Sequence, residues 1–359
     1  MKLRTPNFND PRVRRRMELA LGWTLMTMQV DKTRTLYCRD ISSTNALGQA
    51  NNALSKWLKY HLLTCTNDTF NKDTGRCKEY RLNLEGTRHI AEILNYNVFN
   101  GLSGDYNDLG RELGLRYAQQ QYDLNNIEYQ EKSSRYWNPI QNIRREIRNT
   151  FLARAGMTEQ YDVECCAQTL LYQTYLRLDK PPLMMIESYI SNRTAVRNKI
   201  AEDTGISRSV VKQLLTAMNN NSRLQAHRQC STFHLVDYSE TLVDAYNNHP
   251  TVVYLRTEMS KMWRAIGDTM LDRELITTAS GIERRVTING RMKSTLYFSL
   301  EKLVMDIAYE YLTNNNKRFF KLHDAFITEP ITTQQVTEIT ETIKQQTGYN
   351  IKLERSLNT

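Results

Sequence analysis

Two aspartates occupy positions where the sequence pattern predicts that a strand ends. Asp162, in YDVECCAQTLL, follows a short strand pattern and precedes a helical one, while Asp324, in FFKLHDAFIT, stands at the turn of an apolar hairpin. Carboxylates on adjacent strand ends can hold two divalent ions about 4 Å apart, which clamp the attacking and leaving oxygens of a phosphoryl transfer. Each aspartate also has an ordinary explanation, because Asp162 could cap the following helix and Asp324 could form an Asx turn. Glu164 could join Asp162 on one face if the strand continues.

Two cations stand between these aspartates in the sequence. In GISRSVVKQLLTAMNNNS, Arg208 and Lys212 are four residues apart, which places them one turn apart on one face of a helix. Two stacked cations suit a triphosphate, although such a pair can also be a solvated helix face. The opposite face of the same helix is apolar and predicts packing, through Val211, Leu214, Leu215 and Met218.

The C-terminal third of the sequence predicts the layer that holds Asp324. Apolar residues recur at helical spacing over 294–312, the hairpin occupies 319–330, a second helix covers 332–348, and a last strand covers 349–354. This order predicts an α+β layer with Asp324 at a sheet edge, under a cleft. The buried face of the first helix is predicted to contain Leu296, Leu300, Leu303, Val304, Ile307, Ala308, Tyr311 and Leu312.

The N-terminal part predicts helices around one charged hairpin. Residues 1–17 are polar and basic, with Arg12 and Arg14–Arg16 clustered, and read either as a solvated arm or as a phosphate-contacting tail. The segment TNDTFNKDTGRCKEYRLN predicts a loop or hairpin that could face either a nucleic-acid backbone or solvent. Its basic residues around Tyr80 are Lys72, Arg76, Lys78 and Arg81.

Composition narrows the class of protein. The 359 residues are 40% hydrophobic, enough for sizeable cores, and the 48 basic against 39 acidic residues give a net charge of +9. That excess suits phosphate neutralisation, though many basic proteins bind no nucleic acid. Six cysteines without a Cys-x-x-Cys pair argue for buried reduced thiols rather than a metal site. Neither a signal peptide nor a membrane-spanning run is visible, so we expect an intracellular, cytoplasmic protein without a membrane partner.

The order of these motifs resembles that of single-subunit, bacteriophage-type RNA polymerases and the A-family DNA polymerases. DVECCAQTLL is similar to their first palm motif, RSVVK followed by MNNNS to their fingers helix, and KLHDAFIT to their third motif with His-Asp at a hairpin tip. SSRYWNPIQNIRREIRN is similar to the arginine-bearing segment before the palm, with Arg135 matching its arginine. The resemblance covers roughly residues 130 to 330.

The resemblance implies a mechanism and a role for each matching residue. Asp162 and Asp324 would bind two Mg²⁺ or Mn²⁺ ions, one activating the 3′-hydroxyl and the other stabilising the leaving pyrophosphate. Lys212 would act at the reacting phosphate and Arg208 on the triphosphate tail. Further nucleotide contacts are expected from Asn220 and Gln168. Contacts to the nucleic-acid strands are expected from Arg135, His323 and Arg145.

Two departures from the family pattern bear on specificity. Asn220 and Asn221 stand where the family has Tyr-Gly, which puts the choice between ribose and deoxyribose in doubt, although an amide could bond a 2′-hydroxyl. Ser134 replaces the glycine expected before Arg135. The chain is also much shorter than a complete phage RNA polymerase.

The sequence therefore predicts an α+β, mostly α protein with a right-hand polymerase-like palm, a small antiparallel sheet backed by helices. We expect a helical N-terminal region at 1–125, palm at 126–180, helical fingers at 181–285 and palm again at 286–359. The predicted function is template-directed nucleotidyl transfer by a compact primase or RNA polymerase of a virus or mobile element. A nucleic-acid template, expected to be DNA, NTPs and a helicase or other replication protein are the expected partners.

Three alternatives remain open from the sequence. The same scaffold could use deoxynucleotides as a DNA polymerase, or it could be a non-catalytic nucleic-acid-binding protein that kept the palm. A nuclease could use the same two aspartates, but it would leave Arg208 and Lys212 unexplained.

Overall fold

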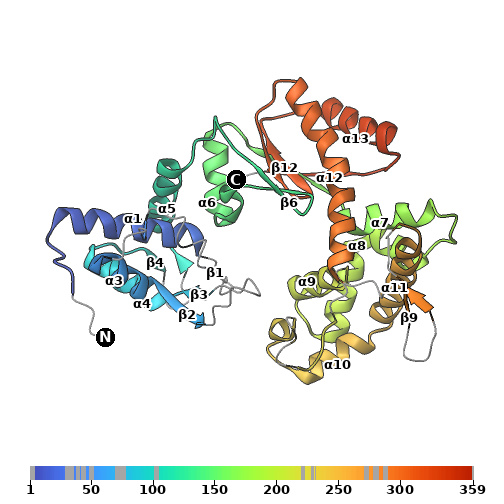
Figure 1. Cartoon of the computed structure of the whole chain (residues 1–359), viewed down its shortest axis with the longest axis horizontal. Coiled ribbons are helices and arrows are strands. Elements are labelled where there is room, and N and C mark those ends of the chain that lie inside the picture. Colours follow the sequence, from blue (N-terminus) through green and yellow to red (C-terminus); the bar gives the residue numbers. More distant parts are fainter. Residues whose placement is uncertain are drawn as a thin grey trace. The chain divides into compact units, whose positions relative to one another are not determined.

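The structure is a computed structural model of the whole chain, shown in Figure 1. It describes residues 5–28, 36–37, 41, 46–47, 52–68, 78–100, 105–219, 223–227, 230, 232–270, 275–277, 283–285 and 290–357. Within these ranges the chain is mostly helical with small antiparallel sheets, which confirms the predicted α+β, mostly α class.

Contacts divide the chain into two compact units. Unit 1 comprises Met1–Gln130, Trp137–Thr158 and Leu357–Thr359, and unit 2 comprises Glu131–Tyr136 and Glu159–Ser356. The segment expected to open the palm, 126–180, is shared between them. Its residues 137–158 belong to unit 1, where Ile147 approaches Gly114 so closely that a Cβ there would lie 2.6 Å from the Ile147 Cδ1 atom.

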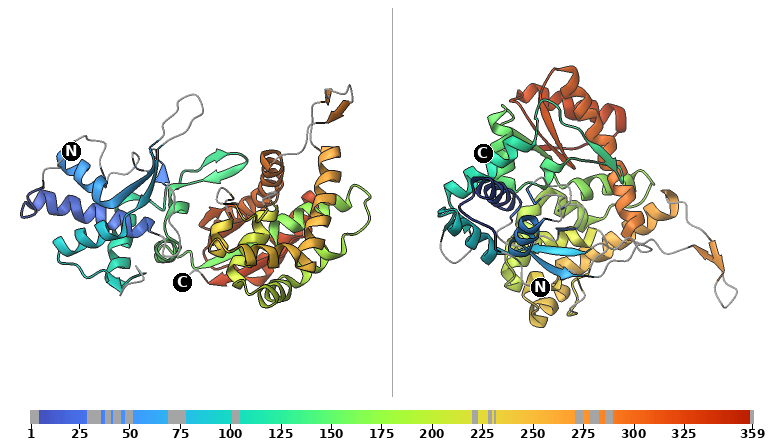
Figure 2. Two further views of the ribbon diagram at one scale, coloured as in Figure 1. Left: turned by 90° about the horizontal axis from the view of Figure 1, so that it is seen from below. Right: turned by 60° about the vertical axis from the view of Figure 1, so that its left-hand side comes forward.

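Unit 1 surrounds small sheets with helices (Figure 2). Its elements are α1 (Pro11–Thr27), β1 (Leu36–Tyr37), α3 (Ala53–Leu62), β2 (Leu63–Asn67), β3 (Glu79–Leu82), α4 (Leu84–Ile93), β4 (Phe99–Asn100), β5 (Asp105–Tyr106), α5 (Asp108–Gln121), the 3₁₀ turn η1 (Pro139–Asn142) and α6 (Arg145–Arg154). The strand order β1-β3-β2 confirms that the charged segment forms a hairpin, and its Lys72 and Arg76 lie outside the described residues.

The predicted basic arm is largely a helix. The side chain of Asp10 accepts a hydrogen bond from Arg12 N and Pro11 takes the first helical position, so α1 begins inside the segment expected to be an arm. Arg14 donates to the carbonyls of Ile93 and Leu94 at the end of α4. This arginine therefore has a structural role within unit 1.

Unit 2 combines a four-stranded sheet with a group of helices. Its elements are β8 (Glu159–Val163), α7 (Cys166–Leu176), α8 (Met184–Thr204), α9 (Arg208–Asn219), the 3₁₀ turn η2 (Phe233–Val236), α10 (Glu240–Asn248), α11 (Pro250–Met270), β9 (Leu275–Thr277), β10 (Glu283–Arg285), α12 (Gly290–Asn314), β11 (Phe319–Leu322), β12 (Ala325–Thr328), α13 (Thr333–Thr347) and β13 (Leu353–Leu357). The hairpin of β6 (Gln130–Lys132) and β7 (Arg135–Trp137) contributes Glu131–Tyr136 to this unit.

The C-terminal elements follow the predicted order, with two differences. The last strand begins at Leu353 rather than 349, because Tyr349 and Ile351 are buried after the left-handed turn at Gly348. The sheet order is β11-β12-β8-β13, so β12 is an interior strand and Asp324 lies at the end of the sheet instead of along its edge. All four residues of β12 are buried.

The burial of one cysteine and of one leucine in α12 differs from the prediction. Cys165 and Cys166 are buried as predicted, whereas Cys65 is exposed, and Cys38 and Cys77 lie outside the described residues. Leu303 was expected on the buried face of α12 but is 49% exposed. The apolar residues of α12 therefore cover a wider part of the helix surface than the part that is buried in unit 2.

We expect Phe326→Ala to lower the free energy of unfolding by about 3–5 kcal/mol, because the ring is fully buried on β12 and stacks with Tyr161 at 5.3 Å between centroids. Urea unfolding followed by circular dichroism measures this change. Leu303→Ala is the control and should cost less than about 1 kcal/mol. Equal costs for the two variants would contradict the described packing.

Candidate active site

The pairing of two strands brings Asp162 and Asp324 together. β12 runs antiparallel to β8 with Ala325 opposite Asp162, and Val163 N donates to the Asp324 carbonyl at 2.9 Å. His323, at a φ of +24°, precedes Asp324 in the turn between β11 and β12. The predicted settings are therefore confirmed: Asp162 lies near the end of a strand that leads into α7, and Asp324 lies at a hairpin tip.

The surroundings of Asp324 favour its protonated form. Burial raises the pKa of Asp324 to about 6, and the negative charges of Glu301 and Asp162 act in the same direction. A backbone hydrogen bond and the nearby Arg135 oppose the rise. An increase of this kind marks a place where negative charge is concentrated in a poorly hydrated setting, which is common in functional sites.

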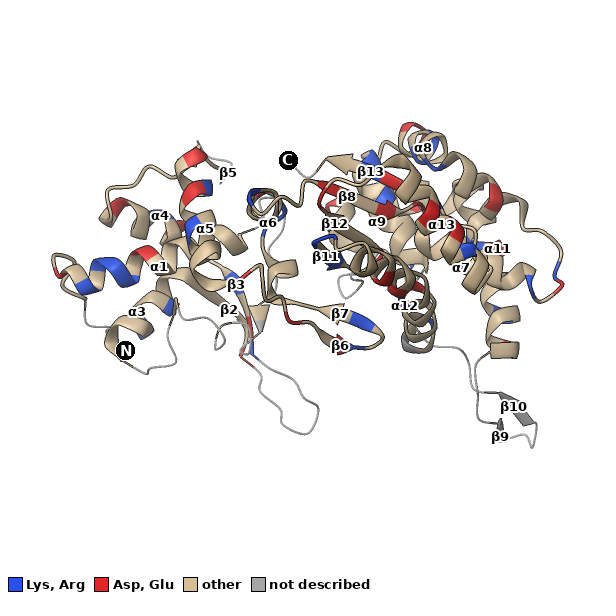
Figure 3. Cartoon of the chain, turned by 90° about the horizontal axis from the view of Figure 1, so that it is seen from above, with Lys and Arg blue, Asp and Glu red and all other residues tan. Residues whose placement is uncertain are grey.

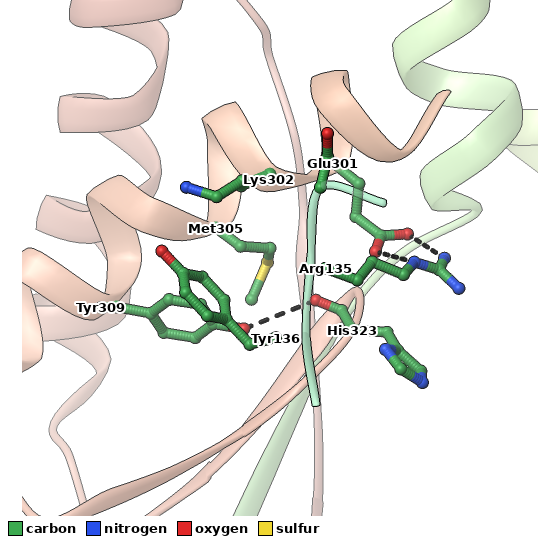
Figure 4. A pocket seen from close by; sticks show the side chains of 8 residues that line it. Arg135, Tyr136, Glu301, Lys302, Met305, Tyr309 and His323 are labelled. Atoms are coloured by element: carbon green, nitrogen blue, oxygen red, sulfur yellow. Dashed lines mark hydrogen bonds and ion pairs between the residues drawn. The ribbon is translucent and has the colours of Figure 1, made fainter. Parts of the chain in front are cut away.

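Glu301 is a third carboxylate of this region that the sequence pattern did not single out. It is 1% exposed on α12 and receives two hydrogen bonds from Arg135, from Nε at 2.7 Å and from a terminal nitrogen at 2.6 Å (Figure 4). The Arg135 guanidinium also covers the Phe298 ring, 3.6 Å from its centroid. A charged residue within the buried stripe of α12, one turn from Tyr297 and Met305, was the available signal.

The two hydrogen bonds between Arg135 and Glu301 give Arg135 a structural role that the sequence did not predict. Its guanidinium was expected to contact a nucleic-acid backbone, and the structure instead directs it to a buried carboxylate of its own unit. A contact to nucleic acid stays a prediction, and the pair shows that Arg135 also joins the β6–β7 hairpin to α12.

Two neutral side chains, those of Cys166 and Tyr297, lie close to the carboxylates. The thiol of Cys166 is buried, and burial together with the charges of Asp324 and Glu301 raises its pKa well above the ordinary value. Burial likewise raises the pKa of Tyr297, next to the same groups. Both side chains stay neutral and add no charge to the site.

The predicted cationic helix is present and is joined to the element after Asp162. Arg208 and Lys212 are exposed on α9, and the four predicted apolar residues of its other face are buried. Arg208 reaches Thr194 Oγ1 at 3.5 Å. Asn219, at the end of α9, is buried together with these apolar residues. Its amide oxygen accepts a hydrogen bond from Gln168 Nε2 at 3.0 Å.

This contact gives Gln168 a partner that the sequence did not predict. Gln168 lies in the first turn of α7, shortly after the strand of Asp162, so the Gln168–Asn219 bond links the end of α9 to the start of α7. Asn220, the residue expected to influence sugar choice, lies outside the described residues. Glu164 is not joined to the pair, because β8 ends at Val163 and the Glu164 carboxylate faces Arg193 at 3.8 Å. Arg145 is exposed in the first turn of α6 in unit 1.

The donors of the site fit a hard divalent cation. Asp162 and Asp324 offer carboxylate oxygens close enough for the charge of Asp162 to act on Asp324, and Gln160 Nε2 donates a hydrogen bond of 2.8 Å to Asp162. Within the described ranges, no group of three or more His, Cys, Asp or Glu side chains is arranged to hold a metal. Two carboxylates suit Mg²⁺, which commonly takes its other ligands from water and substrate phosphates.

Comparison with protein-family models and curated proteins found no relative of this chain. A search of the described helices found none with the length and apolar character needed to span a bilayer. Any function must therefore be argued from the site itself.

The raised pKa of Asp324 predicts a pH-dependent stability in the absence of divalent cations. The folded state binds this proton more tightly than the unfolded chain, so stability falls as pH rises from about 4 to about 6. Asp324→Asn should therefore be more stable than the wild type above pH 6, by about 2–3 kcal/mol, and equal to it below about pH 4. Denaturant unfolding in EDTA across this range tests the effect. Asp244→Asn, at an exposed position, should show no such trend.

The Arg135–Glu301 pair predicts that the effect of replacing Arg135 on stability depends on whether Glu301 is present. Arg135→Met leaves a buried carboxylate without its partner and should cost about 3–5 kcal/mol of stability. Arg135→Met combined with Glu301→Met removes both charges and should recover most of this loss. The free energies of unfolding of the single and the double variant test this prediction. A double variant no more stable than Arg135→Met would show that the unpaired Glu301 charge is not the cause of the loss.

Proposed function

We propose that this protein is a template-directed nucleotidyltransferase, of the compact primase or RNA polymerase type. The observation that carries the proposal is the carboxylate pair: Asp162 lies near the end of β8 and Asp324 at the tip of the adjoining hairpin, where burial and the charges of Glu301 and Asp162 raise the pKa of Asp324. Helix α9, which contacts α7 through the Gln168–Asn219 hydrogen bond, supplies the complementary charge from its exposed residues Arg208 and Lys212 in the same unit.

The resemblance to single-subunit polymerases implies a role for each residue, and the chemistry of each residue suits that role. Mg²⁺ bound by Asp162 and Asp324 would supply charge stabilisation for attack of a 3′-hydroxyl on a nucleoside triphosphate. Lys212 and Arg208 extend from an exposed helix face and would neutralise the triphosphate, with Lys212 nearer the reacting phosphate. Gln168 would offer an amide group to the nucleotide, and His323, next to Asp324, would contact the growing strand.

The proposed substrates are ribonucleoside triphosphates and a single-stranded nucleic-acid template, expected to be DNA. A replication protein such as a helicase is a proposed partner, and the cytoplasm of a host cell is the proposed location. The excess of nine positive charges over the chain favours association with nucleic acid at low salt.

Nucleotide incorporation on single-stranded DNA, with and without a primer, tests this function. NTPs and dNTPs are offered separately with Mg²⁺, and products are resolved on a denaturing gel. The wild type should make primer-free ribonucleotide products. Asp162→Asn and Asp324→Asn should each lose at least about 1000-fold in rate, and Lys212→Gln about 100-fold, because each removes charge complementary to the transition state. Asp244→Asn, a matched exposed control in the same unit, should retain wild-type activity.

The pattern of results separates the possible outcomes. Turnover retained in Asp324→Asn would refute the assignment of the carboxylate pair. Products formed only from dNTPs would assign the scaffold to DNA synthesis. No products under any of these conditions, together with unchanged template binding on addition of nucleotide and Mg²⁺, would favour a protein that binds nucleic acid without catalysis.

A further inference from the structure

Three segments of unit 2 meet at the side chain of Asn247, near the end of α10. Its oxygen accepts a hydrogen bond from a terminal nitrogen of Arg256 on α11 at 2.7 Å, and its nitrogen donates to the Leu224 carbonyl at 2.9 Å. Figure 3 marks the basic and acidic residues on the helices of this unit. Leu224 follows Arg223 in the segment after α9, so Asn247 brings the two arginines into one region.

Within the described residues, neither arginine has a carboxylate partner. Arg256 is partly buried and its guanidinium donates to Asn247, while the side chain of Arg223 is exposed. Burial lowers the pKa of Arg256; the Tyr246 hydroxyl opposes this effect, and the positive charge of Arg223 adds to it. Two positive charges therefore lie close together without the negative charge that would stabilise them.

A buried hydroxyl group beside Arg256 also lacks a partner. Tyr246 is 2% exposed, and its hydroxyl makes no hydrogen bond with any described residue. The positive charge of Arg256 acts on this hydroxyl, so the two side chains lie close together. Buried hydroxyl groups are nearly always hydrogen-bonded, and one that is not requires an explanation. The arginine cluster, formed by Arg223, Tyr246, Asn247 and Arg256, thus offers more hydrogen-bond donors than acceptors.

The arginine cluster lies next to a small pocket at the end of α9. The pocket is lined by Gln168, Ile186, Tyr189, Leu215, Asn219, Leu255 and Met259. Tyr189 is close enough to Tyr246 to raise its pKa, and Leu255 precedes Arg256 on α11. The volume of about 10 Å³ holds at most one water molecule, so a ligand of the arginines must lie outside this pocket.

We propose that Arg223 and Arg256 bind a phosphate group, which supplies the acceptor that the arginine cluster lacks. Each guanidinium has forked donors that match the oxygens of a phosphate, and together they provide two positive charges. The phosphates of a nucleic-acid strand and of a free nucleoside triphosphate share this chemistry, and the test separates the two sources. The site goes beyond the proposed function, because it needs neither the carboxylate pair nor a metal ion.

Helix α11 also carries a matched control. Arg264 follows Arg256 by about two turns of this helix and is exposed. Arg256→Gln and Arg264→Gln remove the same charge from one helix, and only Arg256 belongs to the arginine cluster. Arg223→Gln removes the other cation of the cluster at an exposed position, so its effect on folding should be small.

The test measures binding of a labelled single-stranded oligodeoxythymidylate and of a fluorescent ATP analogue by anisotropy in EDTA, over a series of salt concentrations. Arg256→Gln should weaken binding of one or both ligands about 5- to 10-fold at low salt, and Arg223→Gln about 3- to 5-fold. Where the oligonucleotide is affected, the slope of log K against log salt should fall by about 0.7 in each variant. Arg256→Lys should keep the wild-type slope because it keeps the charge, and Arg264→Gln should bind both ligands as the wild type does.

The outcomes separate the source of the phosphate from the existence of the site. A loss of oligonucleotide binding assigns the site to a strand, and a loss confined to the ATP analogue assigns it to a free nucleotide. Unchanged binding of both ligands in Arg223→Gln and Arg256→Gln overturns the proposal, as does an equal loss in Arg264→Gln or a wild type that binds neither ligand. Melting temperatures verify folding, and Arg223→Gln alone decides if Arg256→Gln melts early. Weakened binding in these variants, with no nucleotide incorporation by the wild type, would keep the phosphate site and remove the polymerase assignment.

Discussion

The antiparallel pairing of β8 with β12 is the constraint on which the site depends. Backbone hydrogen bonds fix the register, and a slip of one residue would turn every side chain to the opposite face of the sheet. The apolar face of the sheet resists such a slip, because Tyr161 and Phe326 are stacked and buried there. Two like charges are thus held together by the packing of their uncharged neighbours.

Helix α12 links the charged and aromatic parts of unit 2. Its successive turns present Glu301 to Arg135, Lys302 to Asp306, and Tyr309 to the β11–β12 hairpin, where the Tyr309 hydroxyl donates to the carbonyls of His323 and Ala325. The hairpin tip is therefore braced from the helix through its backbone. Such bracing is independent of the side chains at the tip.

Local patterns predicted what depends on neighbours in sequence. The hairpin at 319–330, the two-sided helix of Arg208 and Lys212, and the strand-to-helix position of Asp162 were all visible, because turn residues and a repeat of 3.6 are local signals. The exposed Leu303 shows the limit of such patterns: periodicity locates a stripe, but only tertiary packing decides its width. Glu301 and the Gln168–Asn219 bond join residues from distant segments, and neither pairing has a local signature.

The β6–β7 hairpin gives the chain an unusual connectivity. Residues 131–136 belong to unit 2, while the segments on both sides of them belong to unit 1. Unit 2 is therefore completed by a short insert that the chain delivers before the unit's main segment begins at Glu159. During synthesis Arg135 emerges long before Glu301, so the buried pair closes only after most of unit 2 is made. A fragment starting at Glu159 would contain the carboxylate without its arginine, and any continuous stretch that holds all of unit 2 also includes residues 137–158 of unit 1.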